Sequence, residues 1–248
     1  ITWDNFKVAV EALDLWNSAW VSVWYAEFSG LIEVFVCSVI AYGFARFNFK
    51  EKNLIFFLVL ITIIVPNQML VVPMYRSFQD FDVLGVQRLL ELILGKELEW
   101  NLLNTPWTFY LPSLFGVGVR SGLFIFIYRK FFEGLPRELE EAAYVDGAGP
   151  FRTFMSVILP SSGVVFLTVT IFSCIWHWNE SYLSSMFMTD IKPLAVMLDG
   201  FSSAQQAGAD NRMTRMAACL LFIAPMLILY MFLQRKFVQS IDRVGIVG

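Results

Sequence analysis

The side chains that could bind a small molecule are aromatic rings and amides at the end of one apolar run and at a break within another. Indoles can stack on sugar rings, and amides can hydrogen-bond to hydroxyl groups. The candidates of this kind are Trp176, His177, Trp178, Asn179, Asn67 and Gln68. Trp and His at such places also anchor helices at lipid headgroups, so the run from 176 to 179 has two interpretations, a substrate path and an interfacial anchor. Asn67 and Gln68 are candidates for a gate or a path.

Three charged residues lie inside apolar runs: Glu27, Glu33 and Arg120. An unpaired charge there costs about 2.5 to 3.5 kcal/mol even on insertion scales, so each of them must face protein or water. The step from Glu27 to Glu33 is a rotation of about 600° on a helix, which places the two carboxylates on different faces. We predict that Arg120 pairs with Glu27; the alternative is that these charges line a polar path.

Residue patterns typical of enzymes and metal sites do not occur in the sequence. Cys37, Cys174 and Cys219 each stand alone in an apolar run, without a CxxC pattern and without a histidine at ligand spacing. There is no nucleophile–base pair and no phosphate-binding Walker loop. We therefore expect a chain that is not an enzyme and that binds no metal or cofactor of its own.

The composition is that of a membrane protein. Of the 248 residues 57% are hydrophobic, 17% are aromatic and only 16% are charged, and the mean hydropathy is +0.62. The net charge of −3 provides no basic surface for a nucleic acid.

Five apolar runs approach or exceed the roughly 20 residues that a helix needs to cross a bilayer. They are residues 17–45, 54–75, 107–128, 155–178 and 216–234. A backbone in lipid must satisfy its hydrogen bonds internally, so all five are predicted to be helices. Pro66 and Pro73 should break the second one, and broken backbone at membrane depth is tolerated where it lines a cavity or packs against protein.

The distribution of Lys and Arg predicts the orientation of the chain. These residues are concentrated in the link 46–53, in the segment 129–154 and in the C-terminal tail, all of which lie on one side when the spans alternate. The positive-inside rule places that side in the cytoplasm. The first residues and the stretches 76–106 and 179–214 then face outward, the last as a lateral segment too polar to span. This orientation predicts a sixth span upstream of Ile1.

The segment 133–154 interrupts the apolar pattern and predicts a helix, a turn and a second helix. Pro136 suits the first helical position, and acidic residues follow in the first turns, where the helix dipole favours them. Asp146-Gly147 predicts the end of that helix with Gly147 in the left-handed conformation, and a new helix can begin at Pro150. Alanines and glycines make the surface small, as expected of a protrusion that enters a groove of another protein.

This segment resembles the EAA signature of the permease subunits of binding-protein-dependent ABC importers. Glu141-Ala142-Ala143 is followed after three residues by Gly147, and nine residues later by Val157-Ile158-Leu159-Pro160. Specifically, the chain is similar to the smaller permease subunit of the maltose-type carbohydrate-uptake transporters. Further matching positions are Asn17-Ser18, Ala41-Tyr42, Arg46, Phe49, Pro66, Gln68, Pro73, Leu135-Pro136, Leu139, Trp178-Asn179 and the tail from Gly245 to Gly248.

The resemblance implies an all-helical type I ABC importer transmembrane domain over residues 1–248, in the prokaryotic cytoplasmic membrane. It makes the segment 133–154 a coupling loop that docks on an ATP-hydrolysing subunit. The coupling residues that it implies are Glu141, Ala142, Ala143, Asp146, Gly147 and Ala148. The implied partners are a second permease, two ATP-binding subunits that hold ATP and Mg²⁺, an extracellular substrate-binding protein and a carbohydrate.

Two residues and one stretch depart from the family pattern, and two alternative functions stay open. Val157 replaces the usual Ile, Val247 replaces a basic residue near the end of the tail, and the outer stretch 82–101 is longer than in the family. One alternative is an ABC permease for another cargo, such as a phosphorylated polyol or an amino acid. The other is an ion-coupled secondary carrier, which needs no EAA segment.

Overall fold

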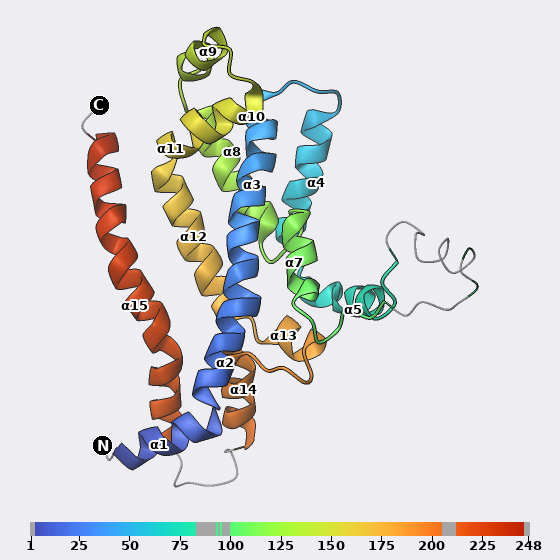
Figure 1. Ribbon diagram of the computed structural model, residues 1–248, viewed down its shortest axis with the longest axis vertical. Coiled ribbons are helices and arrows are strands. Elements are labelled where there is room, and N and C mark those ends of the chain that lie inside the picture. Colours follow the sequence, from blue (N-terminus) through green and yellow to red (C-terminus); the bar gives the residue numbers. More distant parts are fainter. Residues whose placement is uncertain (1–2, 83–92, 94, 96–99, 205–211, 246–248) are drawn as a thin grey trace. The chain divides into compact units, whose positions relative to one another are not determined.

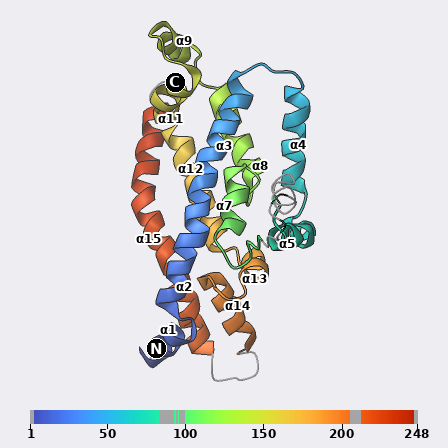
Figure 2. The same ribbon diagram turned by 45° about the vertical axis from the view of Figure 1, so that its right-hand side comes forward.

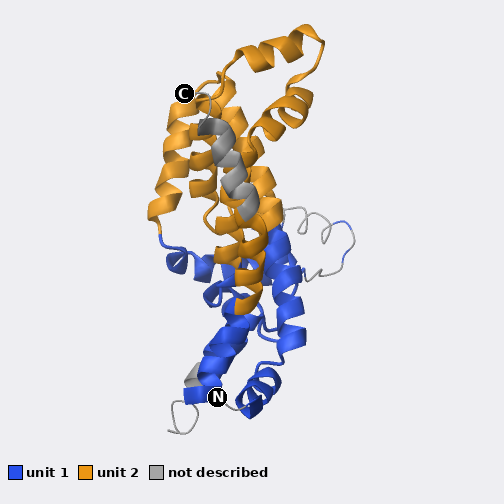
Figure 3. Cartoon of the chain, turned by 90° about the vertical axis from the view of Figure 1, so that its left-hand side faces the viewer, with its two compact units in different colours: residues 1–29, 66–112, 178–223 blue, residues 30–65, 113–177, 224–248 orange. Residues whose placement is uncertain are grey.

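The computed structural model describes residues 3–82, 93, 95, 100–204 and 212–245, and the regular structure within these ranges is helical throughout (Figure 1). Two compact units interleave along the chain, one formed by residues 1–29, 66–112 and 178–223 and the other by 30–65, 113–177 and 224–248 (Figure 3). We call them unit 1 and unit 2. The prediction of one transmembrane domain over 1–248 stays a prediction.

Unit 2 is built around the long helix α3 (Phe28–Arg46), with α8 (Ser121–Glu133) and α12 (Gly163–Trp178) beside it in Figures 1 and 2. On α3, the buried residues Val34, Cys37 and Ala41 recur at the three- and four-residue spacing of one helix face. They pack in one cluster with Phe124 and Tyr128 of α8. Helix α4 (Lys52–Ile64) joins this cluster through a buried phenylalanine.

Unit 1 consists mainly of short helices. They are α1 (Trp3–Ala12), α2 (Leu15–Val21), the π-helix η1 (Ser22–Glu27), the 3₁₀ turn η2 (Asn67–Met69), α5 (Val71–Gln79), α7 (Trp107–Leu114), α13 (Tyr182–Phe187) and α14 (Leu194–Ala204). Side chains join them: the Ser22 hydroxyl accepts the Leu194 N–H at 2.8 Å, and the Tyr110 hydroxyl donates to the Trp24 carbonyl at 2.5 Å. Helix α15 (Arg212–Gly245) begins in this unit and ends in unit 2.

Two helices among the described residues are long and apolar enough to cross a membrane, namely Leu15–Arg46 and Arg212–Gln234. They contain the first and the last predicted spans. In the second predicted span, the helix ends at Ile64 because Val65 is extended before Pro66. This is the predicted break at Pro66. Pro73, in contrast, lies within α5 and does not interrupt that helix.

The prediction of an uninterrupted helix over 107–128 is wrong. Helix α7 ends at Leu114, and α8 begins only at Ser121. Gly116 has a φ of 67°, and a Cβ there would collide with Ile40 on α3. The backbone thus leaves the helix where it touches α3 closely, and protein packing makes that break acceptable at membrane depth.

The prediction of an uninterrupted helix over 155–178 is also wrong. The chain runs through α10 (Pro150–Thr153), the π-helix η3 (Phe154–Ile158) and α11 (Leu159–Ser161) and then bends by 83° into α12. Pro160, which has no N–H to donate, and Ser162, whose hydroxyl bonds to the Ile158 carbonyl at 2.5 Å, lie at the bend. If this bent pair is one span, three described segments can cross the membrane.

Candidate functional site

A short helix, α9 (Glu138–Val145), lies in the connection between α8 and α10 (Figure 1). It begins two residues after Pro136, with Arg137 as its N-cap, which is slightly later than the sequence predicts. Its first turn carries three glutamates, which the positive end of the helix dipole favours. Helix α10 then begins at Pro150, as predicted.

The end of α9 is closed by a Schellman motif centred on Gly147. The Ala148 N–H bonds to the Ala143 carbonyl at 2.9 Å, and the Gly147 N–H bonds to the Tyr144 carbonyl at 3.0 Å. Gly147 has a φ of 79°, which confirms the predicted left-handed conformation. Since an L side chain resists this conformation, glycine makes the turn possible without strain.

The outer surface of α9 and its turn is exposed and carries acidic, small and some larger apolar residues. Glu141, Ala142, Asp146 and Gly147 are exposed, and Val145 is 88% exposed. Ala143 and Ala148 are half-buried. The residues that the resemblance assigns to coupling are therefore together on one protrusion, mostly open to solvent.

The inner side of α9 is fixed by a residue that the sequence analysis did not single out. Glu140 is only 6% exposed, and its Oε1 lies 3.0 Å from Nε of Arg46, the last residue of α3. The Arg46 guanidinium also donates through Nη2 to the Leu135 carbonyl at 2.8 Å. The available signal was a pair of adjacent glutamates, which point about 100° apart on a helix, and an arginine at the end of an apolar run.

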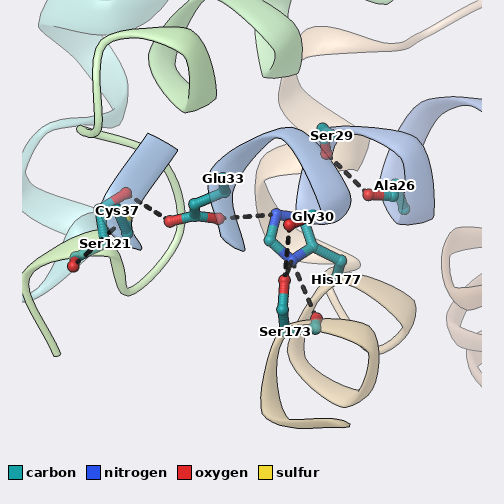
Figure 4. Close-up of polar contacts among 8 residues, drawn as sticks. All are labelled: Ala26, Ser29, Gly30, Glu33, Cys37, Ser121, Ser173 and His177. Atoms are coloured by element: carbon teal, nitrogen blue, oxygen red, sulfur yellow. Dashed lines mark hydrogen bonds and ion pairs between the residues drawn. The ribbon is translucent and has the colours of Figure 1, made fainter. Parts of the chain in front are cut away.

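A second buried polar cluster lies inside unit 2 and surrounds Glu33, which is fully buried (Figure 4). The Ser121 hydroxyl donates to its Oε1, and His177 Nε2 lies 3.2 Å from its Oε2. The other ring nitrogen of His177, Nδ1, is 2.9 Å from the Ser173 carbonyl. The Ser173 hydroxyl oxygen also lies 3.3 Å from Nδ1, so both ring nitrogens of His177 have polar neighbours.

This cluster ties α3 to both of its neighbours. Glu33 belongs to α3, Ser121 begins α8, and His177 lies in the last turn of α12. Ser173 adds a hydrogen bond from its hydroxyl to the Gly30 carbonyl at 3.1 Å. A buried carboxylate needs polar neighbours, and those of Glu33 within the span are Ser121 and His177.

The other substrate-path candidates occupy different surroundings. Trp178 is buried and donates through Nε1 to the Phe222 carbonyl at 3.1 Å, whereas Asn179 is exposed. Asn67 is half-buried and Gln68 is exposed, both in η2. His177 is 2% exposed, so it does not act as a headgroup anchor in this structure. The assignment of these residues to a substrate path stays a prediction.

Arg120 is exposed at the start of α8, with its Cζ 5.7 Å from the ring centre of Trp176. That distance is within the range of a cation–π interaction. Glu27 is half-buried in unit 1, while Arg120 belongs to unit 2. The pairing of Arg120 with Glu27 therefore stays a prediction.

The chain has broken apolar helices, and between α8 and α10 it carries the polar helix α9 and its turn. This combination is expected of a membrane-embedded transport subunit. The chain belongs to the family described as binding-protein-dependent transport system inner membrane component, which matches residues 35–243. It is therefore an integral membrane permease. The matched range includes the whole of α9, Gly147 and both members of the Arg46–Glu140 pair.

Several known permeases are similar over most of the chain. The melibiose, raffinose and stachyose import permease protein MelC of Bacillus subtilis is 28% identical, over all of this chain and 82% of the relative. The arabinooligosaccharides transport system permease protein AraQ of Halalkalibacterium halodurans is 25% identical, over all of this chain and 80% of the relative. The sn-glycerol-3-phosphate transport system permease protein UgpE of Yersinia pestis is 29% identical over 86% of this chain and 66% of its own length.

A solved structure shares the fold. It is the crystal structure of a bacterial ABC transporter involved in the import of the acidic polysaccharide alginate, with a TM-score of 0.65 and 20% identity. The likeness covers 96% of this chain and 80% of that chain. The fold is thus that of an ABC importer permease, as the sequence predicts.

Proposed function

We propose that this chain is one of two permease subunits of an ATP-driven importer and that its cargo is an oligosaccharide. The observation that carries the proposal is the protrusion formed by α9 and its turn. It presents Glu141 and the small residues around Gly147 to solvent while its inner side is fastened to α3 by the Arg46–Glu140 pair. A rigid protrusion of this kind suits a groove of a soluble partner that hydrolyses ATP.

In this mechanism, two ATP-binding subunits bind ATP and Mg²⁺ and close on one another. Their movement carries α9 along, and the permease pair alternates between an inward-open and an outward-open cavity. An extracellular binding protein delivers the substrate on the outer side. The chain itself makes and breaks no covalent bond, and it resides in the prokaryotic cytoplasmic membrane.

The names of the relatives support a carbohydrate cargo. MelC and AraQ are named for oligosaccharides, and both align over all of this chain. UgpE is named for sn-glycerol-3-phosphate at a similar level of identity, and it favours a phosphorylated polyol as the second candidate. A panel of substrates distinguishes the two.

The test is ATP hydrolysis by the assembled transporter, purified through a tag on this chain and reconstituted in lipid. Binding protein loaded with raffinose, stachyose or arabinooligosaccharides should stimulate hydrolysis, and sn-glycerol-3-phosphate should not. Gly147→Pro should abolish the stimulation, because proline is fixed at a φ of about −65° and cannot adopt the turn. Normal stimulation of ATP hydrolysis in Gly147→Pro would contradict the assignment of α9 as a coupling helix.

A further inference from the structure

The contact between α9 and α3 is a buried ion pair and not a surface salt bridge. The side chains of Arg46 and Glu140 are 6% and 8% exposed, and their charged atoms lie 3.0 Å apart. The neighbouring acids Glu138 and Glu141 are exposed. Glu140 is therefore the glutamate of α9 that points into the protein, away from any soluble partner.

Arg46 holds the coupling segment at two points. Its Nε faces Glu140 within α9, and its Nη2 donates to the carbonyl of Leu135, in the link that leads into α9. A guanidinium suits this task because its donors form a rigid planar fork, whereas a lysine has a single ammonium group on a flexible stem. The orientation of α9 is thus defined relative to the end of α3.

The same end of α3 also contacts the segment that leaves α9. The ring of Tyr42 packs against Phe154 of η3 at 5.0 Å between ring centres, and against Phe132 at the end of α8 at 6.2 Å. All three rings are buried. The last turns of α3 therefore touch the link before α9, α9 itself and the segment after it.

Movement of α9 relative to α3 would separate a buried pair of charges. A separated pair leaves two desolvated charges uncompensated, which is far less favourable than a movement of both helices together. A force applied to α9 from outside should therefore displace α3 as well. Because α3 is packed against α8 and α12, the displacement would reach the centre of unit 2.

We infer that Arg46 and Glu140 form an internal strut that makes α3 move with the coupling helix. Both are positioning residues for transport, with Glu140 facing the membrane helices and Glu141 facing the soluble partner. The inference rests on the proposed function of α9 as the coupling helix. It assigns distinct roles to two adjacent glutamates of one motif.

The experiment compares variants of the two glutamates in the complete transporter reconstituted in lipid. Glu140→Gln and Arg46→Met should each lower the stimulation of ATP hydrolysis by loaded binding protein at least tenfold, with unchanged amounts of copurified ATP-binding subunit. Glu141→Gln should instead reduce the amount of ATP-binding subunit that copurifies. Glu138→Gln, an exposed change in the first turn of the same helix, is the matched control and should leave both quantities unchanged.

Two further variants separate coupling from stability. The exchange Arg46→Glu with Glu140→Arg restores the ion pair but not the bond to the Leu135 carbonyl, so it should recover part of the stimulation. Arg46→Lys should also keep part of it, since one ammonium group cannot serve both acceptors equally. Stimulation is expressed per assembled complex, and the thermal unfolding midpoint of each variant is measured alongside.

The outcomes separate this inference from the function on which it rests. Wild-type stimulation in Glu140→Gln and Arg46→Met overturns the strut and leaves the proposed function standing. A lowered unfolding midpoint with unchanged stimulation per complex also overturns it, because the pair would then serve stability alone. Absence of stimulation in the wild-type complex, in contrast, contradicts the proposed function itself.

Discussion

At the scale of single residues, two buried carboxylates of unit 2 each lie beside a polar or basic side chain. Glu33 has Ser121 on one oxygen and His177 on the other, and Glu140 has Arg46. Removing one member of a buried pair typically costs about 3–5 kcal/mol, because the remaining charge loses its compensation. Such pairs typically add little net stability over well-packed apolar residues, and we expect them to serve here by fixing which helices meet.

Gly30 provides a sharp test of the packing around His177. A Cβ at this position would lie 2.7 Å from the Ser173 hydroxyl and 3.1 Å from His177 Nδ1. We expect Gly30→Ala to destabilise the protein by about 1–3 kcal/mol, as overpacking does in tight cores. Gly43→Ala, on the same helix with no atom within 4 Å of the new Cβ, should instead be neutral or stabilising by up to about 1 kcal/mol.

The measurement is the thermal unfolding midpoint of the chain purified in one detergent, for both alanine variants and the wild type. A shared midpoint for Gly30→Ala and Gly43→Ala would contradict the close approach of α3 and α12. The double variant Gly30→Ala with Ser173→Gly, which removes the colliding hydroxyl, should recover part of the loss.

At the scale of helices, Gly147 defines the direction in which the chain leaves α9. Its φ of 79° is the only obstacle to a side chain, since no atom lies within 4 Å of a Cβ placed there. We expect Gly147→Ala to strain the turn by about 1–2 kcal/mol. Gly149→Ala, also with free space around it but with a φ of −75°, should be tolerated.

Stimulated ATP hydrolysis and copurification of the ATP-binding subunit measure this difference. Gly147→Ala should lower one or both several-fold, and Gly149→Ala should match the wild type. Equal behaviour of the two variants would show that the left-handed turn is dispensable for docking. Gly147→Asn serves as an intermediate case, because asparagine tolerates the left-handed region better than alanine.

Helix interiors and helix breaks differ in how far the sequence predicts them. Apolar length predicts the first and last spans, and Pro66, Gly147 and Pro150 predict local ends and starts of helices correctly, because these effects act within a few residues. The breaks after Leu114 and at Ser162 escape prediction. The break after Leu114 depends on the close contact between Gly116 and Ile40 of α3, and these two residues are far apart in the sequence.

The same distinction explains the predictions of site residues. The residues predicted to couple to an ATP-binding subunit follow from a motif whose members are close in sequence, and they lie on one protrusion. The partner of Glu33 was not predicted, because His177 carries no sequence mark that distinguishes a buried ion pair from an interfacial anchor. Likewise, the burial of Glu140 depends on where Arg46 lies in the folded chain.

At the scale of the whole molecule, the distribution of basic residues predicts which ends face the cytoplasm. Exposed positions suitable for a test are Glu138 on α9 and Thr189 after α13. In spheroplasts, a membrane-impermeant maleimide should label Thr189→Cys and leave Glu138→Cys unlabelled until the membrane is opened. The three native cysteines are buried or half-buried and provide the background in the unsubstituted chain.

Labelling of Glu138→Cys from outside would contradict the orientation. Protection of both positions would contradict only the exposure of the outer stretch, since a binding protein or a second permease could cover it. Labelling in detergent provides the reference for full reactivity of each cysteine.

The cluster around Glu33 also has a consequence for biosynthesis. Its members come from distant parts of the chain: Ser121 is 88 residues from Glu33, and Ser173 is 143 residues from Gly30. At a synthesis rate of about 5–20 residues per second, the ribosome needs roughly 7–29 s to make the second interval. Until Ser121 and then His177 have been synthesised, α3 carries an acid whose partners do not yet exist. The surroundings of Glu33 are therefore complete only after α12 has been synthesised, so α3 is made long before it can reach its final packing.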